Sequence, residues 1–268
     1  MSEGGVAAAP GKFGRRGRQR YGTPMRRWLA GLLGLALALA CRPAGAGFGA
    51  PVALPDFPPA GLDEAPALRY AKLARATCEA ELTRRSVPFI AVDEARGVLA
   101  PVRLTGPLHG VTFRTALPKN QRAASPWEIV DCRLALALDD FAVQLAAHDV
   151  TQVIHFSVYR PPVQSWPAGK LASRHPGALA IDAGSFVKKD GTTLEVERDF
   201  HGHIGAVTCG PGAGPDQTTP QALELRRIVC DAADARLFNV VLTPDYNRPH
   251  RNHFHLEVTA GVGWFVVH

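Results

Sequence analysis

The sequence has no uninterrupted apolar run of the roughly 20 residues that a helix needs to cross a bilayer. The apolar stretch near the N-terminus, residues 28–41, has only fourteen residues. It follows the basic segment Met25-Arg-Arg-Trp28 and precedes Ala44-Gly-Ala46, which is the pattern of a signal peptide with its cleavage site after Ala46. We therefore expect a periplasmic or secreted protein. The chain would be membrane-anchored if the leader stays uncleaved or if Cys41 is lipidated.

Beyond this leader, the chain also lacks an excess of positive charge. The formal net charge of the whole chain is +6, but residues 1–46 hold eight Lys or Arg residues and one acid, so this segment contributes +7. The remaining residues therefore carry a formal net charge of −1. No basic stripe with interleaved aromatic residues is present either, so we exclude a nucleic-acid partner.

No internal repeat divides the rest of the chain, which indicates a single domain over residues 67–268 behind a linker rich in Pro, Gly and Ala at 47–66. Its hydrophobic periodicity predicts an α+β fold. Helices are expected at 67–85, from a Ser125 cap to 147, and from a Thr219 cap to about 235. Strands are expected at 89–92, 98–104, 150–159, 179–187, 193–196, 240–243 and 253–258.

Cysteine is scarce, with five residues in the chain, one of which is Cys41 in the leader. The remaining four are an even number, which is typical of two disulfides in an oxidising compartment. Three pairings are possible. Proximity in the sequence and the expected helices favour Cys78 with Cys132 and Cys209 with Cys230.

Two segments carry residues of the kind that bind zinc. His253 and His255 lie two apart on an expected strand, so both would point to one face while Phe254 points to the core. About seventy residues earlier, Asp182 ends the apolar segment 180–182 at the expected mouth of a strand, and His175 lies on the loop before it. Two histidines and one aspartate would leave a fourth zinc position open for water, as in catalytic sites. A lone H-x-H also occurs by chance in a chain with ten histidines.

The spacing Ser-x-His-x(6)-Asp at 173–182, the H-x-H at 253–255 and Ser-x-Tyr-Arg at 157–160 resemble the zinc peptidases that cleave bacterial cell-wall peptides. That group includes D-Ala-D-Ala dipeptidases and carboxypeptidases and murein endopeptidases. From about Cys78 to Val258, the chain is more closely similar to bacterial proteins with an extensin-like C-terminal domain. Residues 78–82, 100–102, 131–138, Cys230 and 250–257 carry that similarity. The resemblance implies a small central antiparallel sheet flanked by helices, as in the D-Ala-D-Ala peptidase or hedgehog-type fold.

The resemblance also implies roles for single residues. The zinc ligands would be His175, Asp182 and His255, with His253 as the catalytic histidine and Arg160 facing the developing oxyanion. Supporting positions beside the site would be His250, Glu257 and Ser173. The implied function is an exported zinc-dependent hydrolase that cleaves peptide bonds in peptidoglycan. The alternative is a non-catalytic, zinc-containing module that binds the cell wall.

The chain departs from these families at two places. Ala178 stands where the peptidases carry a glycine, which puts the shape of that loop in question, and residues 96–99 lack a cysteine that many extensin-like proteins have. A second H-x-H, His201-Gly-His203, follows Asp199. Its glycines indicate a loop, so we expect it at most at the edge of the cleft.

Overall fold

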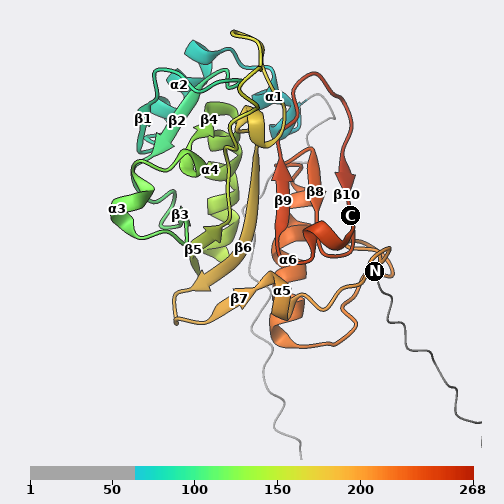
Figure 1. The fold of residues 1–268 in the computed structure, drawn as a ribbon. Coiled ribbons are helices and arrows are strands. Elements are labelled where there is room, and N and C mark those ends of the chain that lie inside the picture. Colours follow the sequence, from blue (N-terminus) through green and yellow to red (C-terminus); the bar gives the residue numbers. More distant parts are fainter. Residues whose placement is uncertain (1–63) are drawn as a thin grey trace, which may run out of the picture. The chain divides into compact units, whose positions relative to one another are not determined.

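The computed structural model describes residues 64–268 (Figure 1). The predicted leader, its cleavage site and Cys41 lie outside these residues. Within the described part of the chain, no helix is both long and apolar enough to span a membrane.

Two sheets form the β part of this α+β fold. The larger sheet has the strand order β10-β8-β9-β6-β5-β3, with β7 paired to β6, and Figure 1 shows β5, β6, β9, β8 and β10 side by side. Its strands are β3 (Thr112–Thr115), β5 (Val150–His155), β6 (Ala180–Lys188), β7 (Thr193–Glu195), β8 (Val240–Leu242), β9 (Phe254–Glu257) and β10 (Val266–Val267). The smaller sheet, of order β1-β2-β4, contains β1 (Phe89–Ala91), β2 (Pro101–Leu104) and β4 (Val130–Asp131).

The longest helix, α4 (Cys132–Ala147), lies at the centre of the fold. Twelve of its sixteen residues are buried, as expected for a helix that is covered on nearly every side. It packs on both sheets and on three other helices, α1 (Pro66–Ala71), α2 (Arg75–Arg84) and α6 (Pro220–Asp234). Two short helices, α3 (Lys119–Arg122) and α5 (Val196–Asp199), complete the set, with 3₁₀ turns at Pro126–Glu128, His175–Gly177 and Arg248–His250.

Several predicted elements are confirmed. The Thr219 hydroxyl accepts a hydrogen bond from the Ala222 N–H and caps α6. Both disulfides join the predicted partners: Cys78 on α2 with Cys132 at the start of α4, and Cys209 with Cys230 on α6. They close chain segments with sequence separations of 54 and 21 residues.

Other predictions were wrong in detail. The helix predicted at 67–85 is two helices, and Leu73 between them packs against the core. Ser125 caps only a 3₁₀ turn, because Glu128 turns away to accept hydrogen bonds from the Thr115 N–H and hydroxyl. The long helix therefore begins later, at an Asp131 cap. The strand predicted at 150–159 ends at His155.

The sheet itself is more mixed than expected. Most strand pairs are antiparallel, as the resemblance implied, but β3 pairs with β5 and β10 pairs with β8 in parallel. The strands β3 and β10 were not predicted, because both are short and lack a clear alternation of apolar and polar residues.

Candidate metal centre

The pairing of β6 with β9 brings the two zinc-type segments together. These strands are antiparallel, with Asp182 directly opposite His255 and Ala183 opposite Phe254. Directly opposed residues on neighbouring strands have their side chains within reach of each other. A pairing between residues more than seventy positions apart in the sequence thus places a carboxylate beside an imidazole.

Asp182 lies at the centre of the cluster and is 1% exposed. Its Oδ1 atom lies 3.0 Å from His175 Nε2, 3.0 Å from His255 Nδ1 and 3.3 Å from His253 Nε2. Burial alone would raise the pKa of Asp182, but hydrogen bonds from the three histidines hold this pKa well below its usual range. Asp182 is therefore a buried anion that faces three imidazole nitrogens.

The hydrogen bonds of the outer ring atoms decide which nitrogen faces the centre. His175 Nδ1 donates to the Val158 carbonyl at 2.8 Å, so a neutral His175 has its lone pair on Nε2, the atom next to Asp182. Since His175 Nε2 and Asp182 Oδ1 are then both acceptors and lie 3.0 Å apart, they need a proton or a cation between them. The arrangement is therefore one that binds positive charge.

His255 lies between two carboxylates. Its Nδ1 faces Asp182 and its Nε2 lies 3.2 Å from Glu257 Oε2. Burial lowers the pKa of His255, but its bonds to Asp182 and Glu257 outweigh this and raise it. In the same way, burial raises the pKa of Glu257 and the bond to His255 brings it below its ordinary value. Glu257 thus holds the orientation of the His255 ring.

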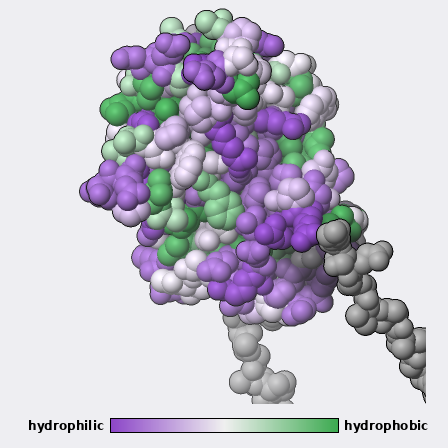
Figure 2. Space-filling view, in the orientation of Figure 1, coloured by the Kyte–Doolittle hydropathy of each residue, from purple (hydrophilic) through white to green (hydrophobic). Residues whose placement is uncertain are grey.

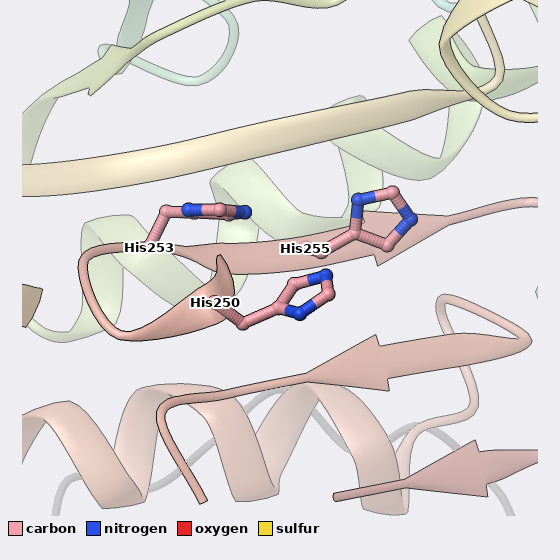
Figure 3. Close-up of side chains that lie close together, drawn as sticks. All are labelled: His250, His253 and His255. Carbon is pink, nitrogen blue, oxygen red and sulfur yellow. The ribbon is translucent and has the colours of Figure 1, made fainter. Parts of the chain in front are cut away.

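Among residues 64–268, two groups of side chains have ligand atoms close enough together to hold a metal ion. The first is His175, Asp182 and His255, all buried, and the second is His250, His253 and His255. In each group the ligand atoms lie within 4.8 Å of one another. Figure 3 shows the second group, with His255 on β9, His253 directly before that strand and His250 on the preceding 3₁₀ turn. The two groups share His255.

Asparagines orient the two outer histidines. His250 Nδ1 donates to Asn247 Oδ1 at 2.6 Å, and His253 Nδ1 donates to Asn252 Oδ1 at 2.8 Å. When either ring is neutral, its Nε2 atom therefore carries the lone pair. The pKa of His250 is lowered to about 4, mainly by burial and then by the charges of His253 and His255.

Arg160 reaches the cluster from an irregular segment rather than from the end of a strand. Its Nε donates to Ser157 Oγ at 2.8 Å, and its guanidinium also pairs with Asp182 Oδ2. The backbone N–H of Arg160 donates to the His175 carbonyl at 3.1 Å. Its side chain is 55% exposed, so one edge of the guanidinium faces solvent next to the histidines.

Ser173 stays outside the cluster, and the loop after it explains the departure at Ala178. Ser173 is exposed, and its carbonyl accepts from the Gly177 N–H at 3.1 Å. Ala178 has a φ of 53°, in the left-handed region that favours glycine. Gly177 has no room for a side chain, because a Cβ there would lie 2.2 Å from the Ala172 carbonyl oxygen. The loop keeps a glycine-like shape with alanine at the strained position.

Sequence reasoning missed two residues next to the cluster. His155, the last residue of β5, lies opposite Ala183, and burial lowers its pKa to about 3. Among the described residues its Nδ1 has no hydrogen-bond partner. Phe156 is 49% exposed and its ring lies edge-on to His253, with centroids 5.8 Å apart. His155 and Phe156 directly precede the Ser-x-Tyr-Arg motif at 157–160, and this position in the sequence could have indicated that they lie near the site.

The second H-x-H does not join the cluster. His203 Nδ1 lies 2.7 Å from Asp216 Oδ1, and both side chains are about half exposed or more. His201 has a φ of 49° in a loop beyond α5. In the described part of the chain, neither histidine belongs to a group with metal-ligand spacing.

A comparison with known families finds one match. The family model described as "Extensin-like protein C-terminus" matches residues 76–266, which is more than half of the chain. No curated protein and no solved structure matches the chain.

Proposed function

The chain belongs to the extensin-like C-terminal family, and from this premise we propose that it is an exported zinc-dependent hydrolase that cleaves peptide bonds in peptidoglycan. The proposal includes a relation of its fold to the zinc D-Ala-D-Ala peptidases and murein endopeptidases. The observation that carries it is the convergence of three histidine nitrogens on one oxygen of the buried Asp182.

The donor set fits zinc. His175, Asp182 and His255 supply two nitrogens and one oxygen, a three-ligand set of the kind that leaves a fourth position for water in catalytic zinc sites. The outer contacts fit as well, since zinc-binding histidines commonly donate their other N–H to a carbonyl or a carboxylate. His175 does so to Val158, and His255 faces Glu257 in this way.

Zinc held there would lower the pKa of a bound water to about 7. The surrounding residues have roles that follow from their hydrogen bonds. His253 would accept at Nε2 the proton that the attacking water loses, because its Nδ1 is held by Asn252, and would later donate this proton to the leaving amine. Arg160 stabilises negative charge that develops on the substrate, because its guanidinium is half exposed beside the ligands.

The two disulfides support an oxidising compartment, and hence the periplasmic or secreted location that the leader predicts. In such a location the cell wall is the accessible polymer. Peptidoglycan or its peptides are therefore the proposed partners.

The second group of possible ligands favours one rival function. If the metal were held by His250, His253 and His255, then His253 would be a ligand and could not carry a proton. The protein would then fit a zinc-containing module that binds the cell wall without cleaving it. Whether His253 binds the metal or carries a proton thus separates the two functions.

The test is a His253→Ala variant, with His201→Ala as the matched control from the other H-x-H. We expect His253→Ala to keep its zinc while release of products from purified sacculi falls by about 10²-fold or more, the scale of a general acid–base group. His201→Ala should keep both. Loss of zinc in His253→Ala would favour the wall-binding function. A wild-type zinc form that binds sacculi but releases no product would reject the hydrolase.

A further inference from the structure

A pocket of about 420 Å³ lies beside the histidine cluster. It is bounded by α5, by the loop 200–204 and by the segment 244–251 that leads to β9. Figure 2 shows strongly hydrophilic residues over the lower right of this face, where Figure 1 draws α5 and the approach to β9.

One residue connects this pocket with the cluster. Asn247 lines the pocket, and its Oδ1 accepts the hydrogen bond from His250 Nδ1. The His250 ring lies 5.2 Å from the His253 ring and 5.7 Å from the His255 ring, between centroids. Phe200, another lining residue, packs on Phe254 of β9 with centroids 5.4 Å apart. A ligand in the pocket would thus lie one side chain away from the cluster.

The wall of the pocket is held by a buried network. Arg226 lies over the Phe200 ring at 4.3 Å and pairs with Asp245 at 3.2 Å. Gly202 passes so close to this pair that a Cβ would lie 2.0 Å from Asp245 Oδ1. The Gly205 N–H donates to the Asp245 carbonyl at 2.7 Å. The loop is therefore fixed in shape without a ligand, as binding pockets usually are.

The charges in the pocket are mostly paired, with one exception. Arg251 lies 3.4 Å from Glu197, and His203 is paired with Asp216. Arg248 lines the pocket and is exposed. Among the described residues its guanidinium has no hydrogen bond or ion pair. The pocket thus offers one free guanidinium beside two apolar lining residues, the buried Phe200 and the exposed Ile204.

We propose that this pocket is a substrate subsite that binds a carboxylate group of an acidic peptide through Arg248. The aliphatic part of the peptide's acidic residue would contact Phe200 and Ile204. The proposal rests on the proposed function and adds the substrate class. An arginine guanidinium matches a carboxylate with two parallel hydrogen bonds. A single free guanidinium with Glu197 nearby suits a singly charged carboxylate better than a doubly charged phosphate.

The test measures binding by titration calorimetry of two peptides that differ in one group. The first probe is the tripeptide L-Ala-γ-D-Glu-L-Lys, and the second is the same peptide with the glutamate α-carboxylate amidated. We expect the wild-type chain to bind the free carboxylate about tenfold more tightly, because hydrogen bonds between charged groups are roughly twice as strong as neutral ones. Analysis of the peptides after each titration shows that they remain intact.

Variants of the pocket should both remove and strengthen this preference for the carboxylate. Arg248→Ala should remove the preference for the carboxylate and Arg248→Lys should keep part of it. Glu197→Gln should strengthen it, because this change removes a negative charge and frees Arg251 from its partner. The control is Arg84→Ala on α2, where the arginine is 70% exposed and paired with Glu81. This control should bind like the wild type.

Three outcomes would overturn the subsite. They are equal affinity of the wild type for both peptides, an unchanged preference in Arg248→Ala, and equally strong displacement by inorganic phosphate at matched ionic strength, which would indicate a general anion site. A failure of the proposed function looks different. In that case zinc or product release is absent while the carboxylate preference and its loss in Arg248→Ala remain.

Discussion

The chain contains the same three-residue pattern twice, and the two copies have opposite surroundings. His253-Phe-His255 lies where β9 begins, with Phe254 as the first strand residue, and both of its imidazoles approach Asp182. His201-Gly-His203 lies in a loop, where His203 pairs with Asp216 near the surface. An H-x-H pattern therefore has chemical meaning only when a strand aligns the two side chains and a neighbouring strand supplies the third group.

The middle residue of each copy accounts for the difference. Phe254 is fully buried and its ring packs on Phe186 and Phe200, so it anchors the strand in the core. Gly202 has no side chain and passes over the Phe200 ring next to Asp245. The first copy is thus fixed by core packing, whereas the second is fixed by the absence of a side chain.

The largest expected difference between the two copies is in zinc binding. Asp182→Ala removes the carboxylate on which the histidines converge, so bound zinc should fall from about one ion per chain to almost none, given the three-ligand requirement of such sites. His201→Ala should leave zinc unchanged. Elemental analysis of the two purified variants measures this directly.

A change in fold could also remove zinc, so Asp182→Asn is added as a variant of nearly the same shape, and circular dichroism of all variants is recorded. The assignment of Asp182 as a ligand is wrong if Asp182→Ala keeps stoichiometric zinc. It is equally wrong if His201→Ala is the variant that loses the ion.

The next effect concerns the two middle residues. Phe254→Ala should lower the free energy of unfolding by about 3–5 kcal/mol, the usual cost of deleting a buried aromatic ring. Gly202→Ala should cost about 1–3 kcal/mol, because the new Cβ forces Asp245 or the loop to move. Urea unfolding followed by tryptophan fluorescence gives both values. If Gly202→Ala proved the more damaging change, core packing would not be what fixes the first copy.

The two disulfides test whether the segment that follows the second copy also supports the metal centre. Loss of Cys78–Cys132 should cost about 4 kcal/mol and loss of Cys209–Cys230 about 3 kcal/mol, since chain entropy favours the longer closed segment. Cys209 follows the loop of the second H-x-H, so the Cys209→Ser/Cys230→Ser variant should keep its zinc. Chemical denaturation and zinc content of each double variant test this. Zinc loss in that variant would mean that the loop supports the metal centre.

Sequence reasoning identified His253 and His255 because strand alternation is a local rule that needs no knowledge of the partner strand. It identified His175 and Asp182 from the spacing Ser-x-His-x(6)-Asp and the resemblance that this spacing carries. The α6 cap and both disulfides were also predictable from local signals. The later start of the long helix at Asp131 was not predictable, because it depends on a tertiary contact between Glu128 and Thr115. His155 was missed for a similar reason: its burial depends on how β5 and β6 pair, which the sequence does not state.

The smallest expected effect comes from a histidine outside both patterns. His148, the C-cap of α4, is buried between Glu224 at 3.2 Å and Asp231 at 3.1 Å, two residues of α6. Lys188 also faces Glu224, at 3.2 Å. Burial lowers the pKa of His148, but its hydrogen bonds to Asp231 and Glu224 outweigh this and raise it. Only the charged imidazole can donate to both carboxylates at once.

The sign of the pH effect follows from the raised pKa. The folded state keeps its proton on His148 above the ordinary pKa of about 6.5, so this stabilisation is complete below pH 6.5 and is lost as the pH rises through the folded-state pKa. His148→Gln cannot titrate and should lack this loss, so the stability advantage of the wild type over the variant should shrink as the pH rises from 6 to 9. Urea unfolding at both pH values measures the difference, in which contributions from the other histidines cancel. Parallel pH profiles for the two proteins would show that His148 is neutral in the folded state and only fills space between α4 and α6.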